Sequence, residues 1–109
     1  MKAQKRSEVK LLRAAEEDLR EVIEYIAREH PASAERLLSS FARTFDALSK
    51  YPELGKLPDD TTLLALVYRY LITGKYLLFY KLEPDVVLIY RILSAARDYL
   101  SILQGKQIE

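Results

Sequence analysis

Residues 66–93, LVYRYLITGKYLLFYKLEPDVVLIYRIL, decide the fold of this chain. The segment is rich in leucine, aromatic and β-branched residues and favours extended strands. The turn sequences Thr73-Gly74-Lys75 and Glu83-Pro84-Asp85 divide it into three strands, at about 66–72, 76–82 and 86–93. Because these connections are short, we expect the three strands to be consecutive antiparallel neighbours.

Both faces of this expected sheet are apolar. A three-residue turn at 83–85 would place one set on the same side: Tyr76, Leu78, Tyr80, Leu82, Val86, Leu88, Tyr90 and Ile92. The opposite side would then carry a second set: Leu77, Phe79, Lys81, Val87, Ile89, Arg91 and Leu93. A three-residue loop at 73–75 would put Tyr68 and Tyr70 with the first set and Arg69 with the second, whereas a two-residue loop would reverse this.

Two amphipathic helices precede the strands. Apolar residues recur at helical spacing from about residue 14 to 29, where acidic residues including Asp18 lie mostly on the other side, and again from Pro31 to Tyr51. The proline separates the helices, because proline disfavours a helical residue before it and suits the first turn of the next helix. The short junction predicts an antiparallel pair above a sheet, since neither helix can bury its apolar stripe on the other alone.

The expected fold is therefore α+β, with two antiparallel helices packed on an antiparallel β-sheet. A strand at about 9–12 and a short C-terminal helix at about 98–103 complete the order β-α-α-β-β-β, and Tyr99, Leu100 and Leu103 should pack back onto the body. We expect one domain over residues 1–109, with its core at about 9–103. The two helices can cover one face only, so a partner or the chain ends must cover the other.

Composition excludes several classes of site and compartment. The 17 basic and 16 acidic residues give a net charge of +1, which argues against a surface built throughout to bind nucleic acid. The absence of cysteine excludes disulfides and thiolate chemistry, and one histidine, His30, cannot build a metal centre, so we expect no metal and no cofactor. No apolar run is long enough to span a membrane and the first eight residues are polar, so we expect a cytoplasmic protein.

A linked series of motifs runs from Val9 to Leu103. The series begins with Ala15, Asp18-Leu19 and Tyr25-Ile26, and it continues with the helical pattern of residues 34–48. The later motifs are, in chain order, Pro52-Glu53-Leu54-Gly55, Arg69, the alternating Tyr76, Leu78 and Tyr80, and Ile92-Leu93 with Arg97-Asp98. In kind and in order, these motifs resemble those of the RelE/ParE toxin superfamily, also called plasmid stabilisation proteins.

The resemblance implies a bacterial toxin of a type II toxin–antitoxin module, bound by a cognate antitoxin in a hetero-oligomer. It leaves two activities open, because ParE-like members poison DNA gyrase without catalytic residues, whereas RelE-like members cut messenger RNA on the ribosome. RNA cleavage needs a base, a cation and an acid. Many family members carry histidine where this chain has Ser94, and His30 lies at a helix junction suited to capping or solvent exposure. The sequence therefore favours gyrase inhibition, and the alternatives are an mRNA endoribonuclease or a degenerate member that only binds antitoxin.

The candidate site residues follow from the same resemblance. If the chain is a ribonuclease, catalysis would rest on Arg69, Arg97 and Tyr99. The candidates for binding the target are Arg69, Arg91, Arg97 and Asp98. The candidates for binding the antitoxin are Tyr68, Tyr70, Tyr76, Tyr80 and Tyr90, since tyrosine offers a large rigid contact with a polar tip. The structural alternatives are an Arg69 pair with a helix carboxylate, a local Arg97–Asp98 ion pair or helix start, and tyrosines that belong to an ordinary core.

Overall fold

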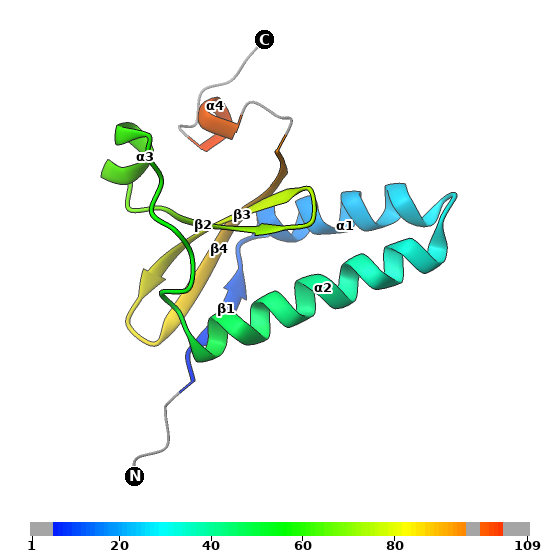
Figure 1. Ribbon diagram of the computed structural model, residues 1–109, viewed down its shortest axis with the longest axis horizontal. Helices are drawn as coiled ribbons and strands as arrows, with labels where there is room; N and C mark the ends of the chain where they lie inside the picture. The colour runs from blue at the N-terminus through cyan, green and yellow to red at the C-terminus, as the bar shows by residue number, and fades with distance from the viewer. Residues whose placement is uncertain (1–5, 96–98, 104–109) are drawn as a thin grey trace.

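The computed structural model, which describes residues 6–95 and 99–103, has two long helices packed on one face of a four-stranded sheet (Figure 1). The elements follow the chain as β1 (Glu8–Leu11), α1 (Arg13–Ala27), α2 (Pro31–Lys50), α3 (Thr61–Ala65), β2 (Arg69–Thr73), β3 (Tyr76–Glu83), β4 (Val86–Ser94) and α4 (Tyr99–Leu103). The expected α+β architecture is confirmed. The short helix α3 is an addition to the expected order of elements.

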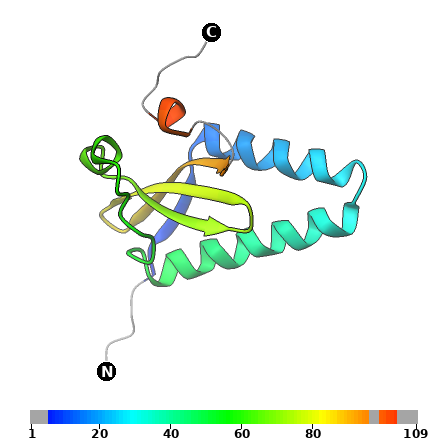
Figure 2. The same cartoon turned by 45° about the horizontal axis from the view of Figure 1, so that its top comes forward.

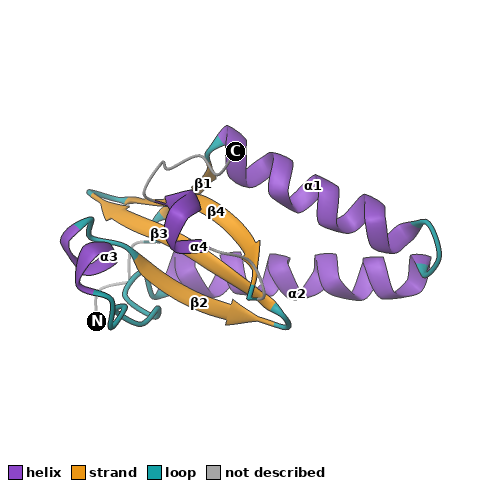
Figure 3. Cartoon of the chain, turned by 90° about the horizontal axis from the view of Figure 1, so that it is seen from above, coloured by secondary structure: helices purple, strands orange, loops and turns teal. Residues whose placement is uncertain are grey.

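The helices α1 and α2 form an antiparallel hairpin that extends beyond the sheet (Figure 3). Pro31 occupies the first turn of α2, where its missing N–H leaves no helical hydrogen bond unmade. None of the helices in the described part of the chain is both long and apolar enough to span a membrane.

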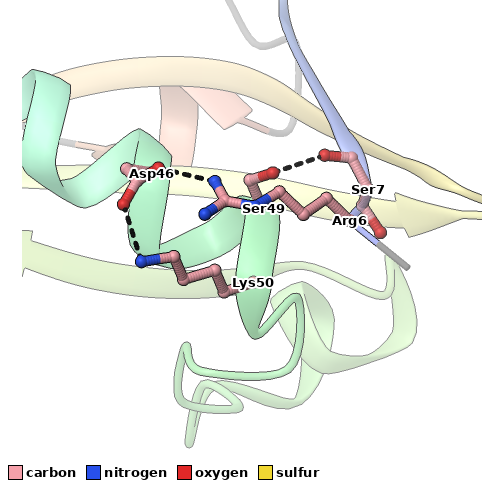
Figure 4. Close-up of polar contacts among 5 residues, drawn as sticks. All are labelled: Arg6, Ser7, Asp46, Ser49 and Lys50. Carbon is pink, nitrogen blue, oxygen red and sulfur yellow. Dashed lines mark hydrogen bonds and ion pairs between the residues drawn. The ribbon is translucent and has the colours of Figure 1, made fainter. Parts of the chain in front are cut away.

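The start of the described chain is tied to the C-terminal end of α2 (Figure 4). Arg6 Nη1 donates to Asp46 Oδ1 at 2.8 Å, and Lys50 Nζ lies 3.3 Å from Asp46 Oδ2. The hydrogen bonds from Arg6 and Lys50 lower the pKa of Asp46. The Ser7 backbone N–H donates to the Ser49 carbonyl, while Ser49 Oγ donates to the Ser7 carbonyl. These contacts fix β1 beside the last turn of α2.

The sheet has the order β1-β4-β3-β2 and is mixed rather than antiparallel throughout. The meander β2-β3-β4 is antiparallel, as expected, but β1 pairs with β4 in parallel, with Val9 opposite Val87. Four residues of β1 carry no sequence signal for strand direction. Their direction follows from the chain path, since β1 must lead into the helix hairpin that covers the sheet.

Both hairpin turns contain two residues. Thr73 pairs with Tyr76 across Gly74-Lys75, and Glu83 pairs with Val86 across Pro84-Asp85. Gly74 and Asp85 have φ values of 60° and 62°, in the left-handed region that such tight turns require. The expected three-residue turn at 83–85 is therefore wrong, and the first turn follows the two-residue alternative.

A β-bulge in β4 changes a second time which of its side chains face the helices. The register shifts between Phe79 and Tyr80, so that Phe79 lies opposite Arg91 while Tyr80 lies opposite Ile89. Tyr90 is the extra residue of the bulge. The two-residue turn at Pro84-Asp85 places Val87 and Ile89 beneath the helices with Tyr80, although both were expected on the opposite face, and the bulge brings Ile92 to the same side.

Two hydrophobic cores lie on opposite faces of the sheet. The first lies between the helix hairpin and the sheet and includes Ala15, Phe41, Leu48, Leu78, Tyr80, Val87, Ile89 and Ile92. The second lies on the other face and includes Leu63, Tyr68, Phe79, Leu93 and Leu103. Helices α3 and α4 lie on the side of the sheet away from α2 (Figures 1 and 2). Part of the second face is thus closed by the chain itself.

Candidate functional site

Arg91 of β4 and Asp18 of α1 form a two-point ion pair. Arg91 Nε donates to Asp18 Oδ2 at 2.7 Å and Nη2 donates to Oδ1 at 2.8 Å. The Ile92 backbone N–H also donates to Asp18 Oδ2, at 3.0 Å. Asp18 is buried, and its hydrogen bonds raise the pKa of Arg91. The pair connects the first helix to the strand at its bulge, so these Arg91 donors hold the fold.

Arg69 of β2 is engaged with the loop that follows α2. Its Nη1 donates to the Gly55 carbonyl at 3.1 Å and more weakly to the Glu53 carbonyl at 3.5 Å. The structural alternative for Arg69 was a pair with a helix carboxylate, but its partners are these backbone oxygens. Arg69 therefore stabilises the loop at the edge of the sheet.

Tyr80 fixes the same loop from inside the first core. Its hydroxyl donates to the Pro52 carbonyl at 2.8 Å and accepts from the Gly55 N–H at 2.7 Å. A Cβ atom on Gly55 would lie 2.5 Å from Tyr80 Oη and 2.9 Å from the Tyr70 carbonyl, so only glycine fits. Burial of the Tyr80 hydroxyl raises its pKa. Because Tyr80 is 0% exposed, it has no surface with which to contact a partner in this structure.

Lys81 lies against two tyrosine rings on the second face. Its Nζ is 4.6 Å from the ring centroid of Tyr68 and 4.8 Å from that of Tyr90. The two rings meet edge to face, with centroids 5.4 Å apart. A lysine over aromatic faces is attracted to their negative π-clouds. Burial raises the pKa of the Tyr68 hydroxyl.

The remaining candidate residues lie at the end of β4 and beyond it. Arg97 and Asp98 fall outside the described residues, as does the side chain of Leu100. Ser94 ends β4 opposite Tyr76 and is half-buried. Tyr99 begins α4 and packs against Phe79, with ring centroids 5.5 Å apart. As expected, Tyr99 and Leu103 of the C-terminal helix pack back onto the rest of the domain, against the second core.

The five candidate tyrosines lie on both faces of the sheet. Tyr76 and Tyr80 belong to the first core, while Tyr68, Tyr70 and Tyr90 belong to the second. Tyr68 and Tyr80 are buried, whereas Tyr70, Tyr76 and Tyr90 are half-buried and retain some accessible surface. The structure therefore divides the tyrosines between two faces instead of forming one patch.

Two residues with structural roles, Asp18 and Gly55, were not recognised from the sequence. Asp18 was placed with the polar face of its helix, but it is three residues after Ala15 and four before Val22, a spacing that puts it on the apolar stripe. Gly55 was noted only as the last residue of the Pro52-Glu53-Leu54-Gly55 motif. Its contact with Tyr80 joins residues far apart in the chain, so no local pattern could indicate it.

The described residues provide no evident metal site. Within 6–95 and 99–103, no three or more histidine, aspartate or glutamate side chains gather in a way that could hold a metal ion. His30, at the junction of α1 and α2, is exposed. No described histidine is therefore close to the arginines of the sheet.

Comparison with known proteins identifies the family. Residues 9–99 match the family described as the ParE toxin of the type II toxin–antitoxin system parDE. No curated protein matches the chain.

Two solved structures share the fold. The chromosomal ParDE TA system from P. aeruginosa has a TM-score of 0.66 at 15% identity, covering 81% of this chain and 95% of that one. The toxin–antitoxin complex RelBE2 from Mycobacterium tuberculosis has a TM-score of 0.58 at 22% identity, covering 89% of this chain and 100% of that one. Because the family match spans most of the sequence, this chain belongs to the ParE toxin family of type II toxin–antitoxin systems.

Proposed function

We propose that this toxin acts as a ParE-like inhibitor of DNA gyrase, through protein contact and without catalysis of its own. The observation that carries the proposal is the engagement of both described candidate arginines within the fold. Arg91 is bound at two points by Asp18, and Arg69 is bound to the carbonyl groups of the 53–55 loop. A ribonuclease would need such cations directed at the phosphate of its substrate.

Among the described residues, no free general base lies against Arg69 or Arg91, and this supports the same choice. Cleavage at a ribose 2′-hydroxyl needs a group that accepts its proton, most often histidine or a carboxylate. Ser94 stands where many family members have histidine, and His30 lies at the helix junction. The carboxylate that lies against Arg91 is Asp18, which is already bonded to Arg91 and Ile92.

We further propose that a cognate antitoxin neutralises the chain in a hetero-oligomer. The two solved structures described above come from toxin–antitoxin systems, which supports a partner of this class. Of the five candidate tyrosines, Tyr70, Tyr76 and Tyr90 keep accessible surface for such a partner. An antitoxin segment that folds on binding could cover them together with exposed apolar residues such as Ile72, which is 64% exposed.

Two parallel assays with the purified, folded chain test the target. A supercoiling assay with DNA gyrase is expected to show inhibition that the cognate antitoxin reverses. In a translating extract, the same preparation is expected to leave messenger RNA intact. Cleavage of translated messages at specific sites, abolished by Arg97→Ala in a variant with an unchanged melting temperature, would establish the RelE-like activity instead. Antitoxin binding with neither activity would identify a degenerate member of the family.

A further inference from the structure

A cavity of about 360 Å³ lies on the second face of the sheet, away from the helix hairpin. Three aromatic rings line it, those of Tyr70, Phe79 and Tyr99, together with the carboxylates of Asp59 and Asp60. The volume lies within the range typical of small-ligand sites, roughly 300–1,000 Å³. The lining includes no lysine or arginine from the described residues.

The walls of this aromatic–acidic pocket are held by the fold. Phe79 and Leu63 are buried and form its apolar base. Tyr70 is bonded through its backbone to Lys56 in both directions, at 2.8 and 2.9 Å, which fixes the start of the 56–60 segment against β2. Asp60 caps α3, because its Oδ1 accepts from the Leu63 N–H at 2.9 Å. The pocket is thus present before any ligand binds.

The two carboxylates keep capacity for a ligand. None of the ion pairs formed among the described residues involves Asp59 or Asp60. Asp59 is exposed at the mouth, and Asp60 uses one oxygen for its cap while its second carries no described hydrogen bond. Two negative charges beside three aromatic rings create a site of negative potential that excludes phosphate.

We propose that this pocket binds an arginine side chain from a basic segment of a protein partner. A guanidinium group is planar, can stack on an aromatic face and can donate two hydrogen bonds to a carboxylate. An apolar side chain would bury part of the carboxylates without a partner, which is unfavourable. A lysine side chain would neutralise the carboxylates, but it has no planar group that could stack on an aromatic ring. The pocket takes this occupant whether or not gyrase is the target, so the binding can be tested apart from toxicity.

The test uses N-acetyl-arginine-methylamide as a probe of the full-length protein, followed by two-dimensional NMR. Peak shifts are expected to gather at Asp59, Asp60, Tyr70 and Tyr99, and to saturate as the probe is added. The neutral analogue N-acetyl-citrulline-methylamide has nearly the same shape and should produce far smaller shifts. Equal shifts from both probes, or shifts spread evenly over the molecule, would overturn the proposal.

Matched variants separate charge from folding. Asp59→Asn with Asp60→Asn removes both charges while asparagine still caps α3, and binding should weaken roughly tenfold because charge-assisted hydrogen bonds are lost. Tyr70→Leu keeps an apolar residue and should also weaken binding. Glu53→Gln removes an exposed carboxylate outside the pocket and should change nothing. Unchanged affinity in the Asp59/Asp60 double variant, with its melting temperature unchanged, would refute the role of the pocket.

Discussion

Asp18 is one of the two buried polar or charged side chains among the described residues, and it bonds both Arg91 and the backbone of β4. Asp18→Ala would leave the part-buried guanidinium and the Ile92 N–H without their acceptor. Breaking a fully buried pair costs about 3–5 kcal/mol, and because Arg91 is 27% exposed we expect a loss nearer 2 kcal/mol. Urea denaturation measures the change in the free energy of unfolding.

An exposed pair on the same helix provides the control. Glu17→Ala removes the Arg13–Glu17 contact, in which the two side chains are 92% and 46% exposed. Surface pairs of this kind contribute about 0.5 kcal/mol or less. Asp18→Asn keeps an acceptor for Ile92 and should be intermediate. If Asp18→Ala costs no more than Glu17→Ala, the ion pair does not hold α1 to β4.

Gly55 has a steric requirement that its position in a loop would not suggest. Gly55→Ala should lower the free energy of unfolding by about 2 kcal/mol, since its Cβ would overlap the buried Tyr80 ring and the Tyr70 carbonyl. Gly74→Ala is a useful contrast, because it meets no neighbour within 4 Å and is opposed only by its φ of 60°. We expect a cost of about 1 kcal/mol there. Thermal or urea unfolding showing the reverse order would contradict the tight contact.

The buried Tyr80 hydroxyl links stability to alkaline pH. Its pKa is raised on folding, so the proton is held more tightly in the folded state than in the unfolded one. The contribution of Tyr80 to stability is therefore complete below the unfolded-state pKa of about 10, and it is progressively lost as the pH rises above that value. Urea unfolding at a series of pH values should show stability falling above about pH 10. Tyr80→Phe should be less stable at neutral pH but decline less steeply, and equal slopes would contradict this role.

At the scale of elements, the helix hairpin was the most predictable part of the fold. The period of the apolar residues and the single break at Pro31 gave both helices to within two residues at each end. Residues 61–65 escaped prediction because five residues make little more than one helical turn, too short for a period to be visible. Only the Asp60 cap marks that helix, and a lone aspartate is equally common in turns.

The strands were predictable, but their faces were not. Alternation along a strand is local, whereas the side that faces the helices depends on turn length and bulges. The two-residue turn at Pro84-Asp85 moved Val87 and Ile89 into the first core, and the extra residue Tyr90 then returned Ile92 to the side of Leu78. A single sequence does not specify where a bulge lies.

Helix α3 should prove important for the second core. Leu63 is 1% exposed and packs in the cluster that includes Phe79, whereas its neighbour Leu64 is 44% exposed. We expect Leu63→Ala to lower the free energy of unfolding by about 3 kcal/mol. Leu64→Ala should change it by about 0.5 kcal/mol or less. Equal effects in urea unfolding would mean that α3 does not close this face.

At the scale of the whole molecule, the family was readable from the sequence but the roles of its arginines were not. The ordered motifs from Val9 onward indicated the superfamily, and the ParE family match confirms it. Arg69 and Arg91 were candidates for binding the target. Their partners, Gly55 and Asp18, are 14 and 73 positions away in the chain, so only the tertiary fold shows that these arginines hold the structure.

In the proposed function, the toxin acts on gyrase through its folded surface, while Arg91 holds the fold by its pair with Asp18. The most direct measurement is gyrase supercoiling in the presence of the wild type and of Asp18→Asn combined with Arg91→Gln, which removes both charges but keeps hydrogen-bonding groups. We expect the folded double variant to inhibit supercoiling over the same concentration range as the wild type. If the wild type leaves supercoiling intact, gyrase is not the target. If the folded double variant loses an inhibition that the wild type shows, Arg91 takes part in inhibition and does not serve the fold alone.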